Sequence, residues 1–76
     1  MTAQGFALFD TPIGACGIAW SARGVAGLQL PEATPDATRA RVKRRWSAAV
    51  ESAPPPGVGR AIERVLALLR GQASDL

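Results

Sequence analysis

Residues 6–30 constrain the fold more than any other part of this chain, because they read as three short strands joined by two tight turns. Pro12 and Gly14 mark the first turn, and Gly24 marks the second. Proline suits a turn because its φ is fixed and it has no N–H, and glycine adopts a positive φ that other residues resist. Turns this short join antiparallel strands. The sequence therefore predicts a three-stranded antiparallel sheet, with strands at about residues 5–10, 15–21 and 25–30.

The alternation of side chains indicates what must cover this sheet. The first strand is apolar on both faces, with Phe6 and Leu8 on one and Ala7 and Phe9 on the other. Such a strand is central or covered on both sides. The second strand has small residues on one face, including Gly17, which allow another element to approach closely.

A first helix is predicted at about residues 35–47. Thr34 can cap it, Pro35 suits the first helical position, and Asp36 lies where the helix dipole favours an anion. The apolar side of this helix is thin and consists of Ala37 or Thr38, Val42 and Trp46.

A second helix is predicted at about residues 57–70, after a run of three prolines at 54–56 that excludes a helix before it. Gly71 is expected to end this helix as its C-terminal cap. One stripe of apolar residues recurs at the helical period: Val58, Ala61, Ile62, Val65, Leu66 and Leu69. We expect this stripe to cover the sheet, because a helix of this length does not persist alone.

The length of 76 residues fits one small domain spanning 1–76. The chain shows neither a secretory signal nor an apolar run of the roughly 20 residues that a membrane span needs, so a cytoplasmic location is expected. With one cysteine and no histidine, it can form neither an internal disulfide nor the usual structural zinc site. We expect no metal and no cofactor.

Two kinds of catalytic site are disfavoured by the residues available. Cys16 has apolar neighbours and no histidine to take its proton, so it is expected to be an inert core residue rather than a nucleophile. A metal-dependent nuclease needs clustered carboxylates around its metal ion. Asp36 and Glu63 are instead expected on the surfaces of the two predicted helices, so they do not indicate such a cluster.

The first helix is strongly basic. Its cations are Arg39, Arg41, Lys43, Arg44 and Arg45, and they spread around the helix rather than forming one stripe. A solvated face is the simpler interpretation, and contact with DNA phosphates is the alternative. Trp20 and Trp46 could stack on bases, but their phase with Ile18 and Val42 favours the core.

The order of these features resembles the N-terminal domain of the methylated-DNA–protein-cysteine methyltransferases, also called O6-alkylguanine-DNA alkyltransferases. That order is Thr11-Pro12-Ile13-Gly14, an apolar strand, a glycine turn, a short strand, a basic helix, a proline-rich loop and an amphipathic helix ending in Leu68-Leu69-Arg70-Gly71. The resemblance spans residue 6 to about residue 71 and implies a ribonuclease-like α+β domain.

In that family, the chemistry belongs to a second domain that binds DNA and carries a Pro-Cys-His-Arg motif. The motif is absent here, so no catalytic or DNA-reading residue carries over to this sequence. The resemblance implies an inactive scaffold domain of a DNA-repair protein that transfers alkyl groups from O6-alkylguanine to its own cysteine. Its partner would be the catalytic domain of the same protein, and DNA would be contacted through that protein.

Two alternatives stay open from the sequence. The chain could be a free-standing basic module that binds nucleic acid, or it could form homodimers through an exposed apolar surface.

Overall fold

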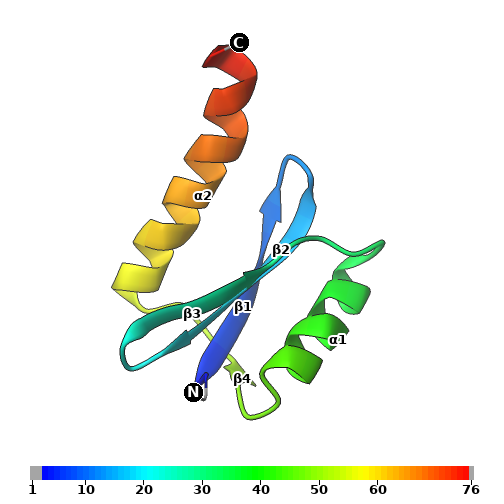
Figure 1. The fold of residues 1–76 in the computed structure, drawn as a ribbon, viewed down its shortest axis with the longest axis vertical. Coiled ribbons are helices and arrows are strands. Elements are labelled where there is room, and N and C mark those ends of the chain that lie inside the picture. Colours follow the sequence, from blue (N-terminus) through cyan, green and yellow to red (C-terminus); the bar gives the residue numbers. More distant parts are fainter. Residues whose placement is uncertain (1–2, 76) are drawn as a thin grey trace.

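The chain folds into a four-stranded sheet with one helix on each face (Figure 1). The structure is a computed structural model that describes residues 3–75, with side chains described for residues 3–71. The elements in chain order are β1 (Gly5–Thr11), β2 (Gly14–Ser21), β3 (Gly24–Gln29), α1 (Pro35–Arg45), β4 (Val50–Glu51) and α2 (Pro56–Asp75). The α+β class predicted from the sequence is confirmed.

The first three strands form the antiparallel meander that the two turns predict. Phe9 pairs with Cys16, and Ala7 pairs with Ile18, which in turn pairs with Leu28. The turn glycines have φ values of 121° for Gly14 and 125° for Gly24, a region that favours glycine. The predicted strand bounds are correct to within one residue.

The prediction that the sheet has only three strands is wrong, because β4 adds a fourth beside β1. The strand order is β3-β2-β1-β4, and β4 runs parallel to β1, with Val50 opposite Gly5. The N–H of Val50 donates to the carbonyl of Gln4 at 3.1 Å. The N–H of Ser52 donates to the carbonyl of Phe6 at 3.0 Å. A strand of two residues has no measurable alternation, so its sequence gives no signal.

The start of α1 is as predicted, and its end comes two residues earlier than residue 47. The hydroxyl of Thr34 accepts a hydrogen bond from the N–H of Ala37 at 3.1 Å and so caps the helix. Trp46 leaves the helical conformation, although its N–H still donates to the carbonyl of Val42 at 2.9 Å.

The predicted end of the second helix at residue 70 is wrong, because α2 continues through Gly71 to Asp75. Of the described glycines, Gly14 and Gly24 have a positive φ, so Gly71 does not adopt the left-handed conformation of a cap. Glycine costs a helix only about 0.5–1 kcal/mol, and the glutamine and alanine that follow favour helix. No helix in residues 3–75 is both long enough and apolar enough to cross a membrane.

One face of the sheet is closed by α1. Phe6 and Ala19 from the strands and Val42 from the helix are fully buried together, and Leu8 and Trp46 pack around them. The glycines of β2 and β3 on this face allow α1 to lie close to the sheet: Val42 occupies the space where Gly17 has no side chain, and the Trp46 ring does the same over Gly27. The close approach predicted from the small residues of β2 is confirmed.

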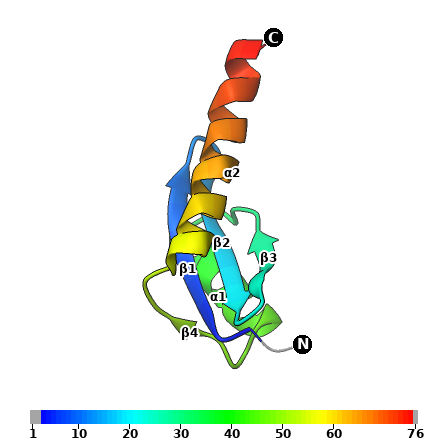
Figure 2. The same ribbon diagram turned by 90° about the vertical axis from the view of Figure 1, so that its left-hand side faces the viewer.

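The other face is closed in part by α2, which lies in front of the sheet in Figure 2 while α1 lies behind it. Ala7, Ile18, Trp20 and Val58 are buried there, with Phe9, Ala61 and Ile62 packed against them. The prediction that the first strand is covered on both sides is therefore confirmed, and Trp20 is a core residue as expected.

We expect Gly17→Ala to lower the free energy of unfolding by about 1–3 kcal/mol, because its methyl group would occupy the space that Val42 fills. Gly59→Ala is the matched control: nothing lies within 4 Å of the added atom, and alanine favours the helix, so stability should rise by about 0.5–1 kcal/mol. Urea unfolding followed by circular dichroism measures both. Equal stability of the two variants would contradict the close approach of α1.

Candidate interaction surface

The helix α2 consists of two halves with different surroundings. In the first half, Val58 is only 4% exposed, and Ala61 and Ile62 pack beside it against the sheet. In the second half, Val65, Leu66 and Leu69 continue the same stripe but are only half-buried. Figures 1 and 2 show the C-terminal part of α2 extending past the strands. The apolar stripe is thus longer than the sheet that covers it.

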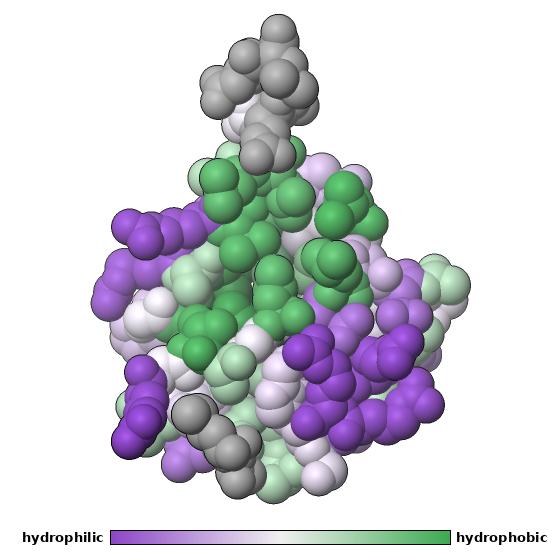
Figure 3. Space-filling view, in the orientation of Figure 1, coloured by the Kyte–Doolittle hydropathy of each residue, from purple (hydrophilic) through white to green (hydrophobic). Residues whose placement is uncertain are grey.

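Apolar side chains from the sheet lie on the same side as this stripe. Leu28 of β3 pairs with Ile18, and Val25 pairs with Trp20, so both belong to the face that α2 covers. Leu28 is 37% exposed and Val25 is 49% exposed. We call the set Val25, Leu28, Val65, Leu66 and Leu69 the apolar face. In Figure 3 hydrophobic atoms form a broad region over α2 and the adjoining part of the sheet.

Charged side chains border the apolar face. Arg60, Glu63, Arg64 and Arg70 are exposed and lie on the remaining sides of α2. An apolar centre with a polar and charged rim is the usual anatomy of a protein–protein interface. Sequence reasoning found the stripe of α2 but not the contribution of β3, because the register between the two elements depends on the folded structure.

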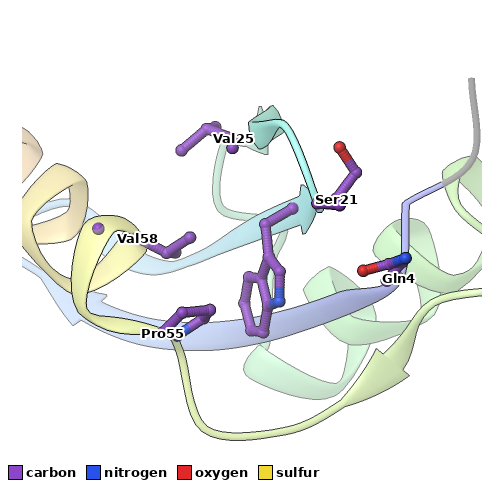
Figure 4. A pocket seen from close by; sticks show the side chains of 9 residues that line it. Gln4, Ser21, Val25, Pro55 and Val58 are labelled. Atoms are coloured by element: carbon purple, nitrogen blue, oxygen red, sulfur yellow. The ribbon is translucent and has the colours of Figure 1, made fainter.

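A cleft of about 430 Å³ opens where the N-terminal end of α2 meets the ends of β2 and β3 (Figure 4). Its wall includes Trp20, Val25 and Val58, with Gln4 and Ser21 as polar neighbours. No residue that lines it is acidic, basic, or a cysteine. The cleft therefore offers shape, apolar contact and the Ser21 hydroxyl, but no charged or titratable side chain.

Two arginines of the predicted phosphate-binding set are held in ion pairs. Arg39 contacts Glu51 of β4 at 3.0 Å and Asp36 at 2.9 Å. The hydrogen bond and charge of Glu51, followed by the charge of Asp36, raise the pKa of Arg39 above its ordinary value. Arg41 lies 3.6 Å from Glu32. Both arginines serve the fold by joining α1 to β4 and to the segment before the helix.

The other three cations differ among themselves. Arg45 donates to the carbonyl of Leu28 at 3.1 Å and to the side chain of Gln29 at 2.9 Å, and its guanidinium lies 4.2 Å from the centre of the Trp46 ring. Lys43 and Arg44 are exposed, and their side chains make no ion pair or hydrogen bond with residues 3–71. Three of the five cations thus contact other segments of the chain, and two do not.

The residues weighed as catalytic groups are not assembled into a site. Cys16 is 1% exposed in the sheet, and its sulfur lies 3.9 Å from the hydroxyl of Thr11. Within the described part of the chain, no three His, Cys, Asp or Glu side chains lie close enough to hold a metal ion.

No family model, curated protein or solved structure matches this chain. The resemblance to the alkyltransferases therefore stays a prediction that rests on the residues and their order.

We expect Cys16 to resist modification in the folded protein, because its thiol is buried and the thiolate is the reactive form. Reaction with a thiol-specific dye should be slow in buffer and complete within minutes in denaturant. A duplex containing O6-methylguanine should leave the mass of the chain unchanged. Rapid labelling of the native protein, or a gain of one methyl group, would contradict the assignment of Cys16 to the core.

Proposed function

We propose that this chain is a non-catalytic scaffold domain that docks on the catalytic domain of a cytoplasmic DNA-repair alkyltransferase. The parent protein would transfer alkyl groups from O6-alkylguanine to its own cysteine. The apolar face is the observation that carries the docking role, because a surface of this kind marks a site where another surface packs. The order of sequence features supports the choice of family.

The architecture is compatible with the rest of the proposal. A mixed sheet with a helix on each face supports the ribonuclease-like relationship that the resemblance implies. The catalytic motif of the family is absent from this sequence, and the one thiol is buried. The chain would therefore contribute position and stability, and the docked domain would contribute the chemistry.

The family assignment can be tested on the gene. We expect the coding sequence that contains these 76 codons, or one directly beside it, to specify a domain with the Pro-Cys-His-Arg motif. Absence of any such domain from the genome would refute the alkyltransferase part of the proposal and leave the apolar face to another partner.

We expect Leu69→Lys to weaken docking without unfolding the chain. Leu69 is half-buried and lies outside the cluster that packs on the sheet, so its apolar area is available to a partner. Burying a leucine contributes about 1.5–3 kcal/mol, which corresponds to a loss of roughly 10–100-fold in affinity. Titration calorimetry with an alkyltransferase catalytic domain measures the change.

The matched control for this experiment is Ala67→Lys. Ala67 is exposed and lies on the side of α2 away from the apolar face. It should leave both affinity and melting temperature unchanged. Equal effects of the two lysines, or no binding by the unmodified chain, would contradict docking through the apolar face.

A nucleic-acid module is the second candidate, and the exposure of Lys43 and Arg44 is what favours it. Phosphate binding should then fall steeply with salt. We expect the double variant Lys43→Ala, Arg44→Ala to abolish any binding to a labelled duplex at low salt, and Arg60→Ala to serve as a charge-matched control on the other helix. If the double variant still binds the duplex, the nucleic-acid contact lies outside Lys43 and Arg44.

A further inference from the structure

The outer edge of β1 is paired over only part of its length. The carbonyl of Gln4 accepts a hydrogen bond from Val50 of β4, and the carbonyl of Phe6 accepts one from Ser52, the residue that follows β4. Successive peptide groups of a strand point to opposite sides, so the N–H and C=O groups of Leu8 and Asp10 face the same edge. β4 pairs with β1 only at Gly5 and Phe6, whereas β2 lies along the other edge of β1 from Gly5 to Thr11 (Figure 2).

The chain itself does not complete this edge. The parallel pairing of β1 with β4 covers Gly5 and Phe6 only, and the last bond is the one from Ser52 to Phe6. After an alanine, the next three residues, 54–56, are prolines, which have no N–H to donate. Among residues 3–71, whose side chains are described, the N–H and C=O groups of Leu8 and Asp10 have no hydrogen-bond partner on this side.

The opposite edge of the sheet is treated differently. β2 uses Gly17 and Ala19 to pair with Gln29 and Gly27, so the carbonyl of Leu28 faces outward. Arg45 donates to that carbonyl and holds its own side chain across the strand. Proteins commonly blunt exposed sheet edges with a charged side chain. The outward carbonyl of Leu28 on the β3 edge therefore has a partner, whereas those of Leu8 and Asp10 on the β1 edge have none among the described residues.

The side chains around the β1 edge indicate what a partner would carry. Leu8 and Phe9 are half-buried on opposite faces, so each has apolar area left beside the edge. Asp10 is exposed on the same face as Leu8 and makes no ion pair with residues 3–71. Cross-strand neighbours favour apolar pairs and opposite charges.

We propose that the edge formed by Leu8–Asp10 is a strand-addition site for an extended segment of a partner protein. The segment would extend the sheet in line with β4, with apolar residues beside Leu8 and Phe9 and a lysine or arginine beside Asp10. Main-chain hydrogen bonds provide the affinity in this mode of recognition, and the alternating side chains provide the specificity.

Two copies of the chain cannot pair through the whole of β1 at this edge. Antiparallel pairing of two β1 strands about Phe9 would place Pro12 of one copy opposite Phe6 of the other. The main chain of Ser52 already occupies that position, because it donates to the carbonyl of Phe6 at 3.0 Å. The free edge is long enough for a short segment but not for the whole strand of another copy.

The site is independent of the proposed docking on an alkyltransferase domain, and a peptide probe tests it separately. The probe is the acetylated and amidated hexapeptide TVVKVT, which has two valines before a lysine. Its control is the same peptide N-methylated at alternate residues, which keeps the side chains but loses main-chain donors. Amide hydrogen exchange measured by NMR reports the site, because Ala7 and Phe9 pair with β2 and are protected already.

We expect the hexapeptide to slow exchange at Leu8 and Asp10 at least tenfold and the N-methylated peptide to have no effect. Asp10→Pro removes the outward N–H of residue 10 and should weaken peptide binding about threefold to tenfold. Asp10→Ala keeps this N–H and should reduce the affinity for the peptide by less. Exchange at Ala7 and Phe9 confirms that each variant is folded, and if Asp10→Pro does not fold, the N-methylated peptide decides.

Three outcomes would overturn the proposal. The first is no protection at Leu8 and Asp10 at millimolar peptide. The second is protection confined to α2 or to β3, which would place the peptide on another surface. The third is protection of these amides without peptide in a dimer seen by sedimentation, which would make a second copy the occupant.

Discussion

The whole arrangement depends on one constraint, which is that β1 and β2 are apolar on both of their faces. Phe6 and Ala19 face one way, and Ala7 and Ile18 face the other, and all four are buried. A sheet of this kind needs a cover on each side, and the two helices provide the covers. The glycines opposite Val42 and Trp46 let α1 lie close, so the centre of that face is sealed. The face under α2 is sealed only near Val58, and this asymmetry leaves the apolar face.

Polar contacts then fix the position of α1 on the sheet, and several of the basic side chains of this helix take part in them. The buried hydroxyl of Thr38 accepts a hydrogen bond from the N–H of Glu32 at 2.9 Å and lies 3.2 Å from the carbonyl of Ala15, so it joins α1 to β2. Arg39 joins α1 to β4, and Arg45 joins it to β3. A buried polar group without partners would be costly, and the described side chains leave none. Arg39, Arg41 and Arg45 thus each contact a segment outside α1.

The meander and both helices could be predicted from the sequence because their signals are local. The turn residues Gly14 and Gly24, the apolar run of β1 and the helical period of α2 are readable without tertiary contacts. β4 could not be predicted, because Val50 forms a strand only through its bond to Gln4. The α2 residues of the apolar face could be predicted from their helical spacing. The contribution of Val25 and Leu28 could not, because it depends on how β3 pairs with β2. The partners of the arginines likewise exist only in the folded chain.

The two surfaces that stay open, the apolar face and the β1 edge, differ in what they can recognise. The apolar face has area but few directional groups, so it provides affinity for a folded partner and little selectivity by itself. The edge of β1 has the reverse character, because the N–H and C=O groups of Leu8 and Asp10 demand an extended backbone in a fixed register. Phe9 of β1 and Ala61 and Ile62 of α2 pack against the same buried cluster, so both surfaces adjoin the same core. For a partner that used both surfaces, the β1 edge would fix its orientation and the apolar face would provide most of its affinity. A scaffold domain requires this combination, because it has to hold another domain in one defined position.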